Sequence, residues 1–214
     1  MGRMTSRIRT KLYLIEDDKT VQDFVRTTLQ RRSDIELVGV SSTFEHAYNH
    51  AANAQADMYL VDLGLPDGRG EEMLEELSYQ LLQPELLVFT VFGDELRLMS
   101  AIKSGATGYV IKGSSPEELL QAIDSILAGS APMTPMLAKR LLDVAEAPAY
   151  ISASSSTQIS ADQLALLKQI SLGYTLEEYC ERTGKASEHA RALLQTVYRS
   201  FTAMARERGR LGAY

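Results

Sequence analysis

The chain has 214 residues, of which 45% are hydrophobic, and a formal net charge of −6. Domains usually have roughly 100 to 150 residues, so this length favours one large globular domain with a small one. No segment approaches the roughly 20 uninterrupted apolar residues of a membrane span, and the basic Met1–Lys11 segment lacks the apolar run of a signal peptide. We therefore expect a cytoplasmic protein with no membrane partner.

Charge and cysteine content narrow the partners further. Residues 1–130 carry 12 Lys and Arg against 20 Asp and Glu, whereas residues 157–214 carry 8 against 6. The acidic first part disfavours nucleic acid, while the mildly basic second part permits contact with DNA phosphates without requiring it. The single cysteine, Cys180, has no partner for a disulfide or a cysteine-based metal site, in agreement with a reducing compartment.

Short apolar runs alternate with amphipathic stretches over the first 130 residues. The runs predict five strands, at Lys11–Glu16, Ile35–Val40, Asp57–Leu63, Leu86–Val91 and Gly108–Ile111. The stretches between them predict helices, including Glu71–Leu81, Glu95–Ser104 and one that opens at Ser115-Pro116 with acidic residues in its first turn. This alternation is typical of an α/β fold with a doubly wound five-stranded parallel sheet.

Helical patterns dominate the rest of the chain. Residues 129–157 contain three prolines and a Ser-rich run, which predicts a linker with a possible short helix over Leu137–Val144. Three helices follow, over Ala161–Ser171, Leu176–Thr183 and Ser187–Phe201 or beyond. We expect a small all-α domain over residues 158–214.

Polar side chains gather where the predicted strands end. A doubly wound sheet binds its ligand at the carboxyl ends of its strands. Three carboxylates there, from Glu16, Asp17 and Asp62, make a hard-oxygen site suited to Mg²⁺. Asp62 would also be the nucleophile that attacks phosphorus, while Lys112 and the hydroxyl of Thr90 would contact the phosphoryl oxygens.

Three motifs carry a family resemblance: LIEDD at 14–18, LVDLGLPDG at 60–68 and GATGYVIK at 105–112. Residues 10–128 resemble the flavodoxin-like receiver domain of two-component response regulators. The resemblance implies that a histidine kinase phosphorylates this domain. The residues it assigns are Asp62 as phosphoacceptor, Glu16, Asp17 and the Gly64 carbonyl as further Mg²⁺ ligands, Thr90 as switch hydroxyl, Tyr109 as rotating aromatic and Lys112 as phosphoryl-binding lysine.

The C-terminal part resembles the helix-turn-helix domain of the LuxR/NarL class, most clearly over GYTLEEY at 173–179 and SEHARALL at 187–194. In that arrangement Thr175 caps the scaffold helix and Ser187 caps the recognition helix. Base readout favours polar and basic side chains, which this helix offers at His189, Arg191, Gln195 and Arg199. Ala192 and Leu193 nevertheless stand where the family tends to place polar or basic contacts, and Glu188 would repel phosphates.

Two functions therefore stay open. In the first, phosphorylation of Asp62 switches homodimerisation and DNA binding to regulate transcription. In the second, the helical domain is degenerate and acts through contacts with a protein partner or with itself. In neither is the chain an enzyme, because a receiver catalyses only its own phosphorylation.

Overall fold

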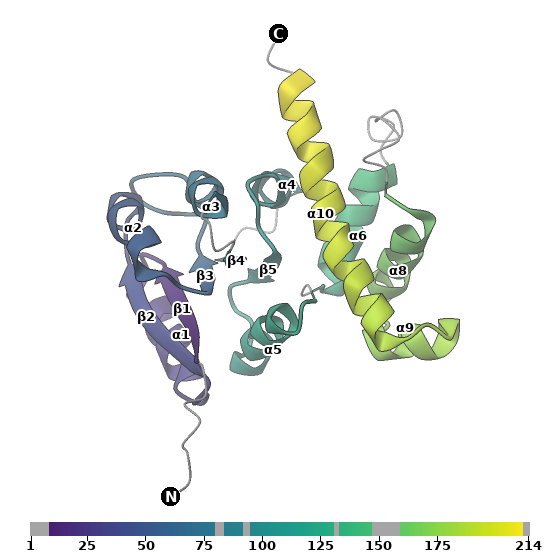
Figure 1. Ribbon diagram of the computed structural model, residues 1–214, viewed down its shortest axis with the longest axis horizontal. Helices are drawn as coiled ribbons and strands as arrows, with labels where there is room; N and C mark the ends of the chain where they lie inside the picture. Colours follow the sequence, from purple (N-terminus) through teal and green to yellow (C-terminus); the bar gives the residue numbers. More distant parts are fainter. Residues whose placement is uncertain (1–8, 80–83, 92–94, 131–132, 147–158, 212–214) are drawn as a thin grey trace, which may run out of the picture. The chain divides into compact units, whose positions relative to one another are not determined.

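Strands and helices alternate over the first part of the chain as predicted (Figure 1). The computed structural model describes residues 9–79, 84–91, 95–130, 133–146 and 159–211. The strands are β1 (Thr10–Ile15), β2 (Ile35–Ser41), β3 (Met58–Val61), β4 (Glu85–Thr90) and β5 (Gly108–Ile111). The helices among them are α1 (Lys19–Leu29), α2 (Phe44–His50), the single 3₁₀ turn η1 (Ala52–Ala54), α3 (Gly70–Ser78), α4 (Glu95–Lys103) and α5 (Pro116–Leu127).

The strands form one sheet in the order β2-β1-β3-β4-β5, and the β1–β2, β1–β3 and β3–β4 pairs are parallel. Every residue of β3 is buried, as its unbroken apolar sequence predicts for a central strand. The prediction of a strand over Asp57–Leu63 was too long. The strand ends at Val61, so Asp62 lies directly after its carboxyl end. The predicted α/β fold with a five-stranded parallel sheet is confirmed.

The described residues group into two compact units, one within 1–92 and 110–120 and the other within 93–109 and 121–214. The first unit holds β1 to β4, α1 to α3 and the chain around Lys112. Carboxylates begin two of its helices. Asp18 caps α1, accepting hydrogen bonds from the amides of Thr20 (2.7 Å) and Val21 (3.3 Å), so this third acid of the motif serves the helix.

The loop after Asp62 is tied to α2 by a carboxylate. Asp67 accepts hydrogen bonds from the amides of Phe44 (2.6 Å) and Glu45 (3.0 Å), in addition to the local cap from Thr43. These amides are among the four that a helix start leaves without intrahelical partners. The two bonds hold the pKa of Asp67 below its usual value.

The lowered pKa predicts how the anchor of α2 depends on pH. A carboxyl group with a lowered folded-state pKa stabilises the fold above its unfolded value, here 3.8, and loses that contribution as the pH falls through the folded value. We expect Asp67→Ala to melt at a lower temperature than the wild type at neutral pH. The difference between the two proteins should shrink as the pH drops below 3.8. A difference that is constant down to full protonation would contradict a role for the ionised group.

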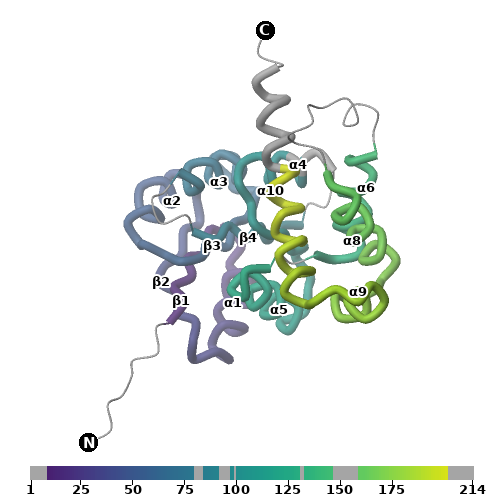
Figure 2. The backbone as a smooth tube through the Cα atoms, turned by 45° about the vertical axis from the view of Figure 1, so that its right-hand side comes forward, coloured from purple at the N-terminus to yellow at the C-terminus, as the bar shows by residue number. Residues whose placement is uncertain are grey.

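The second unit contains four further helices, α6 (Pro135–Glu146), α8 (Ala161–Ser171), α9 (Leu176–Thr183) and α10 (Ser187–Leu211), which gather together in Figure 2. The predicted short helix is present as α6, which packs on α8 and buries Leu137, Ala138, Leu141 and Val144. Residues 131–132 and 147–158 of the expected linker lie outside the described residues. The domain boundaries drawn from the sequence stay a prediction.

Polar caps fix the starts of α8 and α9. Ser160 with Gln163, and Thr175 with Glu178, form reciprocal capping boxes. The predicted cap at Thr175 is thus present. The buried Gln163 also donates to the hydroxyls of Thr196 and Ser200, both at 3.1 Å, and so joins α8 to α10.

Helix α10 continues for 25 residues, well beyond Phe201. The predicted cap at Ser187 was wrong, because Ser187 is the first helical residue and the Ala186 carbonyl accepts from the Ala190 amide at 3.1 Å. Among the helices that the structure describes, none is both long and apolar enough to cross a membrane.

Candidate functional site

The parallel ladder places the predicted site residues at one edge of the sheet. The amide of Glu16 donates to the Ser41 carbonyl and that of Asp62 to the Ile15 carbonyl, both at 2.9 Å. On the other side, the amide of Lys112 donates to the Thr90 carbonyl at 2.8 Å. Glu16, Asp62 and Lys112 therefore each follow a strand directly, and all three belong to the first unit.

Three carboxylates meet at this edge. One oxygen each from Glu16, Asp17 and Asp62 lie within 4.8 Å of one another. Glu16 and Asp62 are buried, with 0% and 4% of their surface exposed, and Asp17 is exposed. The sequence prediction that these three acids come together is thus matched by the geometry, with one ligand open to solvent.

The Lys112 ammonium lies between the two buried acids. Its Nζ is 2.8 Å from Asp62 Oδ2, 2.9 Å from Glu16 Oε1 and 2.7 Å from Glu16 Oε2. The lysine side chain is only 10% exposed. A buried charge is tolerated only when it is paired, and here one cation serves two anions.

Burial and pairing act in opposite directions on these groups. Burial raises the pKa of the Glu16 carboxyl, and the nearby Lys112 offsets only part of this effect. For Lys112 burial alone would lower the pKa, but the hydrogen bonds to Asp62 and Glu16 prevail and raise it. The lysine is therefore held protonated.

The acids suit a hard divalent cation. Asp62 Oδ1 is buried and has no hydrogen-bond partner among the described residues, so this carboxylate has an acceptor available for a cation. The three carboxylates together with one lysine leave a net negative charge, which Mg²⁺ would neutralise. Gly64 lies exposed in the loop after Asp62, and its carbonyl stays a predicted ligand.

Two supporting residues were missed by the sequence prediction. Gln22 is buried on α1 and donates from Nε2 to the Glu16 carbonyl at 2.6 Å and to the Ser42 hydroxyl at 3.0 Å, which fixes the turn after β1. At Gly70 a Cβ would collide with the main chain of Asp62 and Leu63, so the loop after Asp62 closes only over a glycine. The sequence signals that could have identified them are the glycine at the start of α3, for Gly70, and the polar residue on a mostly apolar helix face, for Gln22.

Comparison with known proteins decides the family. The model for the response regulator receiver domain matches residues 12–124, more than half of the chain. This chain belongs to the response regulator receiver family. The receiver fold inferred from its three motifs is confirmed.

Relatives of this response regulator belong to the LuxR/NarL class. The chain is 32% identical over 142 residues to the nitrate/nitrite response regulator protein NarL of Escherichia coli (strain K12), a match that covers 64% of this chain and 66% of NarL, slightly under two thirds. The oxygen regulatory protein NreC of Staphylococcus epidermidis is 26% identical over 178 residues, covering 80% of this chain and 82% of NreC.

Solved structures agree in fold. A two-component response regulator of the LuxR family from Aurantimonas is 29% identical, with a TM-score of 0.59 over 64% of this chain and 97% of that one. The Salmonella typhimurium response regulator RcsB has a TM-score of 0.58 over 94% of this chain and 100% of its own, at 15% identity, which speaks for the fold alone.

The two predicted switch residues are both buried. Thr90 ends β4 with 0% of its surface exposed, and Tyr109 in β5 has 4% exposed. Thr90 belongs to the first unit of the response regulator and Tyr109 to the second. Their coupling stays a prediction.

The predicted DNA-contacting residues lie on α10. Arg191, Gln195 and Arg199 recur every fourth residue and so share one face, on which the two arginines are exposed and the glutamine is half-buried. His189 is exposed on the same helix. Nearby, Lys185 is committed to an ion pair with Asp162 at 2.8 Å, which removes one cation from this surface.

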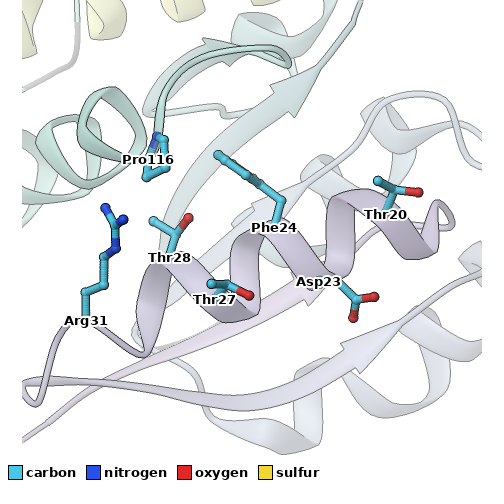
Figure 3. Close-up of a pocket in the computed structure, with 7 residues that line it drawn as sticks. All are labelled: Thr20, Asp23, Phe24, Thr27, Thr28, Arg31 and Pro116. Carbon is cyan, nitrogen blue, oxygen red and sulfur yellow. The ribbon is translucent and has the colours of Figure 1, made fainter.

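A groove lies along α1 of the receiver domain, and Figure 3 labels the residues that line its larger part. Its larger part has a volume of about 320 Å³ and is lined by Thr20, Asp23, Phe24, Thr27, Thr28, Arg31 and Pro116. A smaller part of about 140 Å³ shares Thr20 and Phe24 and extends to Phe89 and Lys112. This smaller part therefore reaches Lys112, which pairs with Glu16 and Asp62.

Proposed function

We propose that this chain is a response regulator that a histidine kinase phosphorylates on Asp62 and that thereby switches its dimerisation and its binding to DNA. The observation that carries the proposal is the buried Asp62 carboxylate, which has one oxygen on Lys112 and the other unpartnered among the described residues. A nucleophile is thus held in place beside the cation that would balance an incoming phosphoryl group.

In this mechanism Glu16, Asp17, Asp62 and the Gly64 carbonyl would hold Mg²⁺, which supplies charge neutralisation at the phosphoryl oxygens. An Asp62 oxygen attacks the phosphorus of a phosphohistidine. The new P–O bond forms as the P–N bond breaks, and the histidine leaves with the bonding electrons. Lys112 donates hydrogen bonds to the phosphoryl group, and the Thr90 hydroxyl and Tyr109 respond to the new charge.

The groove along α1 is the proposed docking site for the phosphohistidine-bearing domain of the kinase. Its lining combines the ring of half-buried Phe24, which stacks on Phe89 with ring centroids 6.3 Å apart, with polar side chains at the rim. Apolar anchors surrounded by polar groups are typical of protein interfaces. Because the smaller part of the groove extends to Lys112, a phosphohistidine bound there would lie close to the Asp62 carboxylate.

Truncation of the Phe24 ring tests the docking site. We expect Phe24→Ala to slow phosphotransfer from the kinase about tenfold or more, the effect of losing an aromatic anchor. Phosphorylation by acetyl phosphate, which needs no docking surface, should keep its rate. Tyr48→Ala removes an exposed aromatic ring outside the groove and is the matched control. Equal slowing with both donors would mean that Phe24 supports the site rather than the kinase.

The arginines of α10 are the proposed phosphate and base contacts. We expect the double variant Arg191→Ala, Arg199→Ala to weaken promoter binding. The slope of log affinity against log salt concentration should also become shallower, by about one unit for each DNA phosphate that an arginine no longer neutralises. Arg26→Ala, an exposed arginine on α1 of the other unit, should change neither. Mobility shifts at several salt concentrations measure both quantities. Absence of salt-sensitive DNA binding in the wild type would favour an output through protein contacts instead.

The remaining parts of the proposal follow from this role. The receiver transfers the phosphoryl group only to its own aspartate, so the chain turns over no separate substrate. A regulator that meets its kinase and chromosomal DNA works in the cytoplasm.

A further inference from the structure

Two histidines sit on one face of α2, outside the phosphoacceptor site. His46 and His50 are four residues apart, and their ring centroids are separated by 4.4 Å. Both side chains are exposed. Residues at this spacing are neighbours on a helix surface, so the two imidazoles can reach one common ligand.

A buried hydroxyl orients the first ring. The Nδ1 atom of His46 lies 2.6 Å from Ser41 Oγ, whose residue is 1% exposed. Ser41 Oγ is in turn 2.8 Å from the hydroxyl of buried Tyr13. This chain of contacts commits Nδ1 and leaves Nε2 as the ring nitrogen for another partner. Metal-binding histidines are usually fixed in this way by a hydrogen bond at the second nitrogen.

We propose that His46 and His50 form a chelating site for a divalent transition metal such as Zn²⁺, Ni²⁺ or Cu²⁺, separate from the magnesium site. Imidazole ligands select these metals, whereas the carboxylates around Asp62 select Mg²⁺. Pairs of histidines at this spacing on a helix are a known zinc-binding arrangement. Ala47 follows His46 where the hydrolytic versions of that arrangement place a glutamate base, so the site binds a metal without hydrolysing a substrate.

The site is a two-residue chelate completed by solvent. Among the described residues, the only cluster of three or more histidine, cysteine or acidic ligands is Glu16, Asp17 and Asp62. Binding would stabilise the folded form of α2, because the ligand pair exists only there. Since Asp67 ties the start of this helix to the loop after Asp62, the ion would act next to the phosphoacceptor loop without touching its acids.

Calorimetric titration of the full chain with Zn²⁺, in the presence of excess Mg²⁺, tests the site. We expect one equivalent to bind to the wild type and to His189→Ala, which lacks the third histidine of the sequence. His46→Ala and His50→Ala should each lose this binding. Ser41→Ala should weaken it about tenfold, the usual effect of removing a hydrogen bond to a metal-bound histidine.

Two further measurements locate the ion independently of folding defects in the variants. In the wild type, Zn²⁺ should shift the ring resonances of His46 and His50 and leave those of His189 in place. The Asp62→Asn variant should bind Zn²⁺ with unchanged affinity. Loss of binding in Asp62→Asn, or unchanged binding in His50→Ala, would overturn the proposal. Neither outcome depends on whether Asp62 accepts a phosphoryl group.

Discussion

The Asp62→Asn variant is expected to incorporate no phosphoryl group, either from a phosphohistidine donor or from acetyl phosphate. An amide has nearly the shape of the carboxylate and can still accept a hydrogen bond from Lys112, so the fold should persist. It lacks the anionic oxygen that attacks phosphorus. Incorporation of radiolabelled phosphate measures the effect, which should be a complete loss.

A matched control lies in the same loop. Asp67→Asn keeps one of the two oxygens that accept from the amides of Phe44 and Glu45, and its side chain serves α2 rather than the acidic cluster. It should incorporate phosphate as the wild type does. Retained labelling of Asp62→Asn, or equal loss in both variants, would place the acceptor elsewhere.

Removal of the Lys112 ammonium should have the largest effect on stability. In Lys112→Met the buried carboxylates of Glu16 and Asp62 lose their shared cation. Breaking a buried ion pair by deleting one partner costs about 3–5 kcal/mol, because the remaining charge stays buried without compensation. We expect the Mg²⁺-free variant to lose this much free energy of unfolding at neutral pH. Phosphorylation should also slow about 100-fold or more, since a donor to the transition-state charge is gone.

Charge compensation can be separated from packing. Lys103→Met, at an exposed lysine on α4, should leave the stability unchanged. Mg²⁺ should restore part of the stability of Lys112→Met, because the ion supplies the missing positive charge. The double variant Glu16→Gln, Lys112→Met should be more stable than Lys112→Met alone, since one of the two buried charges is removed as well. A Lys112→Met protein as stable as the wild type without Mg²⁺ would refute the electrostatic account.

The sequence predicted the sheet and the place of the site for a physical reason. Strand β3 has no polar alternation, which only a strand buried on both faces tolerates, and strand ends in parallel sheets converge. The positions of Glu16, Asp62 and Lys112 then follow from local pattern alone.

Contacts between distant segments could not be predicted in the same way. Gln22 donates to the Ser42 hydroxyl, and the amides of Phe44 and Glu45 donate to Asp67. No local periodicity relates the residues that these bonds join. The contacts of Lys112 with both Glu16 and Asp62 depend on the conformation of a long side chain at the edge of the sheet. The prediction for α10 left its end open, because no glycine or proline interrupts residues 187–208 and nothing in the sequence marks an earlier stop.

The most direct test is a crystal structure of the protein with Mg²⁺ and trifluoroberyllate, which mimics a phosphoryl group on a carboxylate. We expect beryllium bonded to an Asp62 oxygen and Lys112 Nζ within hydrogen-bond distance of a fluorine. The magnesium ion should be coordinated by Glu16, Asp17, Asp62 and the Gly64 carbonyl. Trifluoroberyllate on another side chain, or a magnesium ion remote from these acids, would contradict the assignment of this edge of the sheet as the phosphoacceptor site.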